Sequence, residues 1–261
     1  MTDNIYLHSK LESFLGDPNF PTKITSSITS RGERIKFYEN LYKQYSFLSF
    51  TRWEDRPIAI AGLEKRLIID LKTLGGFGVF DDGASFVRRS LLWQRSAETS
   101  TMRRITFPVE RNTVVPSWSW MAYEGGIDYL DLPLGGVDWI KDDRDYEIRS
   151  PWSRDAGEIC RTTNSTESIE LSAIAREFDV RSGGGNEFMI IYDIPKTEGQ
   201  ALRCIVMGRR MENGRPEDAR HYVLFVAPKG NSVYERVGVG YMPGRFIKLG
   251  DAGLSRMVKI R

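Results

Sequence analysis

The apolar residues of this 261-residue chain recur with one spacing before Pro108 and with another after it. From Glu33 onward they return every three or four residues, which places them on one face of a helix. Beyond Pro108, short alternating segments are separated by Gly, Pro and Asp, a pattern typical of antiparallel strands. Helices followed by strands predict an α+β fold, with N-terminal helices packed on a mainly antiparallel C-terminal sheet or barrel.

Three helices are expected in the first half of the chain. The first starts at Glu33 and buries Tyr38 and the apolar residues that follow at helical spacing. The second has Asp55 as its cap and Pro57 in its first turn, and it stops at residues 75–76, which are both glycine. The third is shorter and runs over residues 82–94, with Trp93 pointing inward.

The second half is expected to consist mostly of strands joined by turns. A single compact domain over residues 1–261 follows, with an extension and loop at 1–32, a helical part at 33–107 and a mainly β part at 108–261. The expected strands are residues 126–130, 137–140, 146–149, 169–175, 188–192, 202–207, 222–226, 233–239 and 256–260.

Charge and composition limit the partners of this chain. The 37 Lys and Arg residues nearly balance the 35 Asp and Glu residues, so no general attraction to nucleic acid is expected. The arginine pairs at 88–89 and 103–104 are expected to lie on solvated faces or beside carboxylates. No stretch approaches about 18 consecutive apolar residues, which predicts no membrane span. The first residues lack a secretory pattern, so a cytoplasmic location is expected, with Cys160 and Cys204 reduced.

The usual catalytic and metal-binding motifs do not occur in this sequence. Its two histidines, His8 and His221, are too few and too far apart for a typical zinc site, and no metal or cofactor is expected. Residues 75–78, Gly-Gly-Phe-Gly, lack the Lys-Ser/Thr of a phosphate loop and are interpreted as a turn. Cys204 lies in an apolar strand, where a free cysteine usually acts as a small buried apolar residue.

Three short motifs point to a known family. They are Leu91-Leu92-Trp93, Pro116-Ser117-Trp118-Ser119-Trp120 and Glu235-Arg236-Val237-Gly238, in this order. Together they resemble the C-terminal region of fungal heterokaryon-incompatibility (HET) proteins, over about residues 35 to 240. The N-terminal HET domain of that family has no counterpart before residue 35. The resemblance therefore implies a stand-alone module, and it does not carry over the triggering of cell death.

The aromatic residues around the second motif suggest a site. Residues two apart on an extended strand point to the same side, so Trp118 and Trp120 are expected to share a face. With Trp93 and Tyr123 they form either part of the core or the wall of a pocket. The same choice applies to Arg236, for which a structural ion pair is preferred over a binding role.

The pocket interpretation leads to an enzyme. Trp93, Trp118, Trp120 and Tyr123 would bind an apolar small molecule in a reactive shape, and Arg95, His221 or Tyr222 would donate to a substrate carbonyl. Such a site suits a cofactor-independent cyclase or isomerase of fungal specialised metabolism, of the Diels–Alder type. The core interpretation leads instead to a non-enzymatic regulatory or protein-interaction module. The oligomeric state is not predicted.

Overall fold

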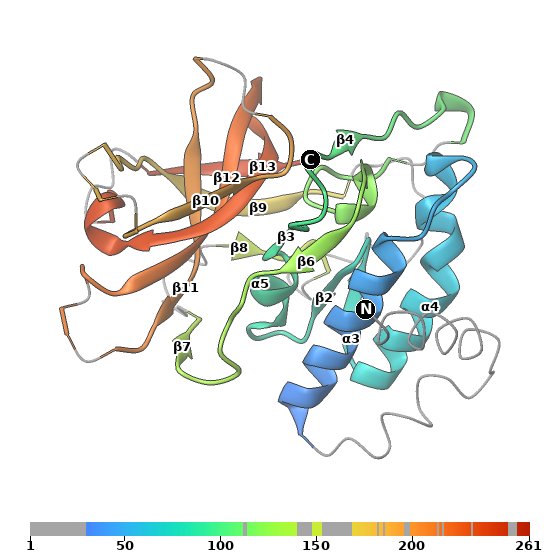
Figure 1. The fold of residues 1–261 in the computed structure, drawn as a ribbon, viewed down its shortest axis with the longest axis horizontal. Helices are drawn as coiled ribbons and strands as arrows, with labels where there is room; N and C mark the ends of the chain where they lie inside the picture. The colour runs from blue at the N-terminus through green and yellow to red at the C-terminus, as the bar shows by residue number, and fades with distance from the viewer. Residues whose placement is uncertain are drawn as a thin grey trace.

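The computed structural model describes residues 30–111, 114–139, 148–152, 169–195 without 182 and 185, 199–249 without 213, 216 and 231, and 255–261. Helices and strands are mixed in these residues, which confirms an α+β protein. Figure 1 shows the long strands gathered on one side and α3 and α4 on the other, with α5, β3 and β6 between them. None of the described helices is long and apolar enough to cross a membrane.

Helix α3 (Arg31–Ser46) begins at a side-chain cap. The Ser30 hydroxyl accepts a hydrogen bond from the backbone N–H of Glu33 at 3.2 Å, which satisfies one of the free donors of the first turn. Tyr38, Leu41, Tyr42 and Tyr45 lie on its buried face, as their spacing predicts. Leu48, the last residue of that pattern, lies beyond the end of the helix.

Helix α4 (Arg56–Leu71) follows the single 3-10 turn η1 (Trp53–Asp55) and has Pro57 in its first turn, as expected. The predicted stop at the two glycines is wrong. The helix ends earlier, because Lys72 adopts a left-handed conformation with φ 54°. Strands β1 (Leu74–Gly76) and β2 (Val79–Asp81) then form a hairpin, and its turn is the predicted one at residues 75–78.

The third helix, α5 (Phe86–Ser90), is shorter than residues 82–94. Leu91 and Leu92 leave the helix, and Trp93 begins strand β3 (Trp93–Arg95), which pairs with β6 (Ile127–Tyr129). Trp93 is buried as expected, although it lies on a strand. Two further short strands, β4 (Arg103–Arg104) and β5 (Tyr123–Glu124), also pair with each other. The turns η2 (Val109–Arg111) and η3 (Trp120–Ala122) complete this part of the chain.

Five strands close into a barrel. They pair in the order β11 (Arg203–Arg210), β12 (Arg220–Gly230), β13 (Val233–Pro243), β14 (Ser255–Ile260) and β9 (Leu171–Arg176), and β9 pairs back to β11. All of these pairs are antiparallel except β13 with β14. Three shorter strands add to the edges: β7 (Val137–Asp138), β8 (Ile148–Arg149) and β10 (Met189–Tyr192). Residues 140, 146 and 147 of the expected strands lie outside the described residues.

The two glycines of strand β13 allow β10 to lie against it. A Cβ at Gly240 would stand 1.8 Å from the carbonyl oxygen of Met189, and one at Gly238 would stand 2.3 Å from that of Ile191. Real side chains never approach a carbonyl oxygen so closely, so only glycine fits at either position. The glycine of the Glu-Arg-Val-Gly motif therefore has a packing reason.

Buried residues form three clusters. One lies between α3, α4 and the β3–β6 pair and contains Trp93, Trp120 and Tyr123. The second contains side chains from all five barrel strands together with Trp118, so it fills the inside of the barrel. The third lies on another face of β11, β12 and β13 and contains Cys204, which is fully buried as expected. The barrel and the helical part each have a core of their own.

Candidate functional site

The first and last motifs of the family resemblance meet inside the protein at Arg236. Its side chain has no exposed surface and forms an ion pair with Asp193, with 2.8 Å between Nε and Oδ2. It also donates from Nη1 to the carbonyl of Leu91 at 2.7 Å and from Nη2 to the carbonyl of Trp93. The structural ion pair expected at Arg236 is confirmed, although the carboxylate comes from Asp193, outside the motif.

The second motif joins the same group through the Ser117 hydroxyl and through two backbone carbonyls. The Ser117 hydroxyl accepts a hydrogen bond from the backbone N–H of Arg236 at 3.1 Å. The indole of Trp93 donates to the carbonyl of Trp118 at 2.9 Å, and the hydroxyl of Tyr123 donates to the carbonyl of Ser117 at 3.0 Å. All three motifs thus connect the helical part to the barrel.

The four residues predicted to bind a substrate belong to the core. Trp93, Trp118 and Trp120 are 0% exposed, and Tyr123 is 1% exposed. A ring that not even a water molecule can touch does not line a cavity that a substrate enters. The core interpretation therefore describes these four residues in this structure, and their role in substrate binding stays a prediction.

The two indoles of the second motif do not share a face. Residues 117–118 form a turn, and the Ser119 hydroxyl accepts from the backbone N–H of Met121 at 3.1 Å to cap η3. This break in the extended backbone sends Trp118 into the barrel cluster and Trp120 into the helical cluster. Trp118 packs edge-on against Trp152, whereas Trp120 packs against tyrosines of α3. The predicted common face requires a strand that does not form here.

The three predicted catalytic residues are not assembled around one cavity. Arg95 on β3 donates from Nε to the carbonyl of Tyr192 at 3.3 Å and from Nη1 to that of Thr99, so its guanidinium holds backbone in place. His221 and Tyr222 are neighbours on β12, and neighbours on a strand face opposite sides. Tyr222 points into the barrel cluster, so His221 points away from it.

The protonation of these two neighbours also follows from burial. Burial lowers the pKa of His221, whose Nδ1 lies 2.9 Å from the carbonyl oxygen of Ala219. Burial raises the pKa of Tyr222. Both side chains therefore stay neutral near pH 7, each 2% exposed and on its own side of the strand. The prediction that either acts beside the tryptophans on one substrate is not supported by this arrangement.

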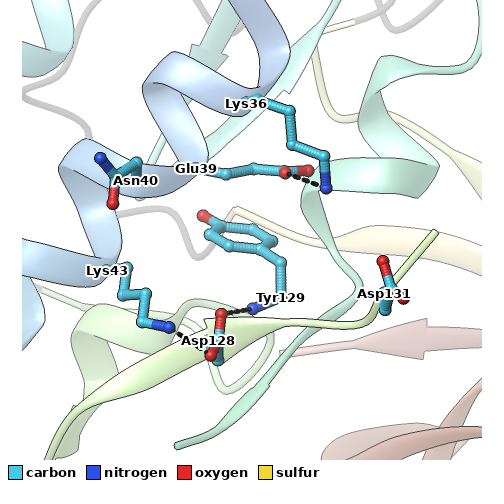
Figure 2. A pocket seen from close by; sticks show the side chains of 7 residues that line it. All are labelled: Lys36, Glu39, Asn40, Lys43, Asp128, Tyr129 and Asp131. Atoms are coloured by element: carbon cyan, nitrogen blue, oxygen red, sulfur yellow. Dashed lines mark hydrogen bonds and ion pairs between the residues drawn. The ribbon is translucent and has the colours of Figure 1, made fainter. Parts of the chain in front are cut away.

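An open pocket does occur elsewhere, between helix α3 and strand β6. It has a volume of about 320 Å³. Figure 2 shows α3 on one side and β6 on the other, with the ring of Tyr129 rising from the strand toward the helix. The lining residues are Lys36, Glu39, Asn40 and Lys43 from the helix, and Asp128, Tyr129 and Asp131 from the strand and its continuation.

Most charges around this pocket are already paired. Lys43 Nζ lies 2.5 Å from Asp128 Oδ2 and connects the two walls. Lys36 Nζ lies 3.4 Å from Glu39 Oε2, and Glu39 is held from behind by Arg89, with 3.0 Å between Oε1 and Nε. These pairs fix the walls of the pocket and leave few groups free to bind a ligand.

Tyr129 is the exception within the pocket. Its side chain is 8% exposed, and its buried hydroxyl has no hydrogen-bond partner. Burial raises the pKa of this phenol well above its ordinary value, and the nearby Glu39 carboxylate adds to the effect. The group therefore keeps its proton and is a neutral hydrogen-bonding group that lacks a partner. Buried polar groups rarely stay without a partner, and this hydroxyl is one of several exceptions among the described residues.

A second pocket, of about 370 Å³, lies at the start of α3. Its rim is bridged by an ion pair between Arg31 and Asp82. Its lining residues are Arg31, Arg34, Ile35, Leu71, Thr73, Asp82 and Phe86. None of the predicted site residues lines either pocket. Within the described residues, no group of three or more His, Cys, Asp or Glu side chains is placed to hold a metal ion.

Sequence reasoning missed the α3–β6 pocket for a definite reason. Lys36, Glu39, Asn40 and Lys43 follow helical spacing on the polar side of α3, and such a face is ordinarily solvated. Tyr129 and Asp128 belong to the same aromatic-rich stretch as the tryptophans, but nothing in their spacing shows that they face α3. The arginine pairs are better anticipated, since Arg89, Arg103 and Arg104 each pair with a glutamate.

Comparisons with known proteins do not identify the chain. No family model matches it, and neither the curated proteins nor the solved structures include a match. The resemblance to the C-terminal region of HET proteins therefore remains a hypothesis that depends on the three motifs.

Proposed function

We propose that this chain is a non-enzymatic recognition module, related to the C-terminal region of fungal HET proteins, that works in the cytoplasm. The observation that carries this proposal is the use of the three motifs. Their residues build a closed core around the pair of Arg236 and Asp193, where they join the helical part to the barrel. Residues used in this way maintain a scaffold, and the function belongs to a surface on it.

The cyclase hypothesis has less support from this geometry. Its substrate would have to contact Trp93, Trp118 or Trp120, none of which has any exposed surface. Removing one such side chain from a core typically lowers the free energy of unfolding by about 3–5 kcal/mol, a large share of the total for a domain. Opening a substrate cavity beside these rings would lose much of the same packing. The proposal therefore assigns no substrate to the tryptophans.

The α3–β6 pocket is the surface that we assign to recognition. Its volume of about 320 Å³ is at the small end of the size range of ligand sites, roughly 300–1,000 Å³. Its walls are held in position by the ion pairs of Glu39 with Arg89 and of Lys43 with Asp128. Fixed walls that carry the exposed polar side chains of Asn40 and Asp131 suit selective binding of one polar group, whether on a partner protein or on a small molecule.

The two functions can be separated by where ligands bind. A nitroxide label would be attached at Asn40→Cys in the pocket and, as a matched control, at Met211→Cys, an exposed position on the barrel. Both variants would carry Cys160→Ser, and Cys204 is buried and will not react. Small charged and apolar fragments would then be screened by the broadening of their NMR signals, and linear terpene and polyketide precursors would be tested for a product of unchanged mass.

The recognition proposal expects charged fragments to be broadened by the label at residue 40 and not by the label at residue 211. It also expects no product of unchanged mass. Saturable quenching of tryptophan fluorescence by apolar fragments, together with such a product, would overturn it in favour of the cyclase.

A further inference from the structure

Helix α4 has a second apolar face, on the side away from the core. Its buried face carries Ile60, Leu63 and Leu67, spaced three and four residues apart. Its exposed positions also recur at helical spacing, and they are Ile58, Ala59, Gly62, Lys65 and Ile69. Ile58 is 57% exposed and Ile69 is 76% exposed. Only one of these five exposed positions carries a polar side chain.

This pattern is unusual for a helix at the surface of a protein. A helix that packs one face on the core ordinarily shows polar and charged residues on the other. Helix α3 follows this rule, since its exposed residues are Arg31, Glu33, Lys36 and Asn40. Figure 1 shows α4 next to α3 on the side of the molecule away from the barrel, so the barrel does not cover the outer face of α4.

Gly62 has no packing reason among the described residues. It lies in the middle of the 16-residue helix, where glycine is less favourable than alanine. No described atom lies within 4 Å of the place that a Cβ would take there. The distance between two packed helices depends on the side chains at their crossing, so a surface glycine allows a second helix to come close. Ile58 lies one turn before this point and Ile69 two turns after it.

The charge on this face is positive. Lys65 lies on the face and Lys72 follows the last turn, and both are exposed without a described ion pair. The carboxylates of the helix do not balance them, because Glu64 accepts a hydrogen bond from the backbone N–H of Gly78 at 2.6 Å and Asp70 already interacts with another described residue. An occupant of this face therefore needs apolar side chains together with negative charge.

We propose that the outer face of α4 is a docking surface for an acidic amphipathic helix of a partner protein, which crosses α4 at Gly62 and packs against Ile58 and Ile69. Its carboxylates lie opposite Lys65 and Lys72. A second copy of this face fits less well, because it brings the same positive charges. The surface is separate from the α3–β6 pocket, so its failure would leave the recognition role of that pocket untouched.

The test measures binding of three peptides to the full chain by fluorescence anisotropy and locates the site by amide chemical shifts in NMR. Each peptide has the length of α4 and is stapled to hold it helical, because short helices are marginal in water. The acidic peptide has leucines along one face and glutamates on the others. The basic peptide has lysine in place of glutamate, and the scrambled peptide has the acidic composition without a leucine face.

Two kinds of variant test the two parts of the proposal. Gly62→Ala and Gly62→Leu place side chains of increasing size at the crossing. Both side chains enter open space on a helix, so both variants fold and raise the urea midpoint of unfolding. Lys65→Glu reverses the charge of the face. Lys229→Glu is its matched control, because Lys229 is an exposed lysine on barrel strand β12.

The expected result is saturable binding of the acidic peptide with shifts at residues 58–69, and no such binding of the scrambled peptide. The basic peptide binds about tenfold more weakly, and Lys65→Glu weakens the acidic peptide by about fivefold, because an attraction becomes a repulsion. Gly62→Leu weakens it by about tenfold although the protein is no less stable, and Gly62→Ala weakens it less. Lys229→Glu leaves binding unchanged.

Three peptide results overturn the inference. They are no binding of the acidic peptide at residues 58–69, equal binding of the acidic and basic peptides, and unchanged binding to Gly62→Leu. Hydroxyl-radical labelling of the free full chain tests the other occupants. Protection of Ile58 and Ile69 in the monomer would assign the face to residues 1–29 of the same chain, and protection only in a dimer would assign it to a second copy. Either result replaces the partner protein.

Discussion

Replacing Arg236 by Met tests the role assigned to the three motifs. The change removes the partner of Asp193 and the donors to the carbonyls of Leu91 and Trp93, all inside the core. Breaking a buried ion pair on one side typically costs about 3–5 kcal/mol, because the remaining charge is left uncompensated. Burial already raises the pKa of Asp193, so this carboxylate will gain a proton more easily once Arg236 is gone. That protonation sets the cost near the lower end of the range.

The size of this effect matters because a domain is stable by only about 5–15 kcal/mol in total. Urea unfolding followed by tryptophan fluorescence and by circular dichroism measures the change. The double variant Arg236→Met with Asp193→Leu is expected to recover part of the loss, since replacing both partners by apolar residues leaves no buried charge. The control is Arg104→Met, which removes a pair with Glu235 that is partly exposed and costs less than about 1 kcal/mol.

Two results would refute this reasoning. In the first, Arg236→Met unfolds within about 1 kcal/mol of the wild type, which would show that the pair is not a structural element. In the second, the double variant loses as much as the two single variants together, which would show that the two side chains act independently.

Three further predictions concern packing and pH. Trp118→Ala and Trp120→Ala each lower the free energy of unfolding by about 3–5 kcal/mol in urea titrations, and a fully stable variant that has lost only ligand binding would contradict the core assignment. Gly240→Ala displaces β10, costs at least about 1–3 kcal/mol and speeds hydrogen exchange over residues 189–192; unchanged exchange there would rule out the close approach. Burial raises the pKa of Glu64, so the folded state holds its proton to higher pH than the unfolded state, and stability falls as pH rises above about 4.5. Glu64→Gln should flatten this fall in urea midpoints measured between pH 4 and 7, and an equal slope in both proteins would show that another group causes it.

The proposed function gives the three motifs a structural meaning in place of the binding role that their sequence suggests. Residues that stand out in a sequence are often taken for a binding site, yet Arg236, Trp93 and Trp118 are joined to one another by hydrogen bonds and ring contacts in the core. Their role is to hold two parts of the chain together. A relative with the same motifs could therefore share this scaffold and still recognise a different ligand at its surface.

Local patterns in the sequence were enough to predict the mixed fold. The spacing of Tyr38 and Tyr42 favours a helix with one buried face. The short apolar runs at residues 203–207 and 222–226, bounded by polar segments, favour buried strands. Such signals depend only on near neighbours, so they can be read without knowing the tertiary structure.

Tertiary structure alone decided where the helices stop and which residues meet. Lys72 ends α4 before the glycines, and the turn at residues 117–118 sends Trp118 and Trp120 to different clusters. Asp193 and Arg236 are 43 positions apart in the sequence. Tyr129 is likewise distant in sequence from helix α3, which it faces across the pocket. Pairing across such distances depends on how β3, β6 and the barrel pack together, and no local spacing encodes it.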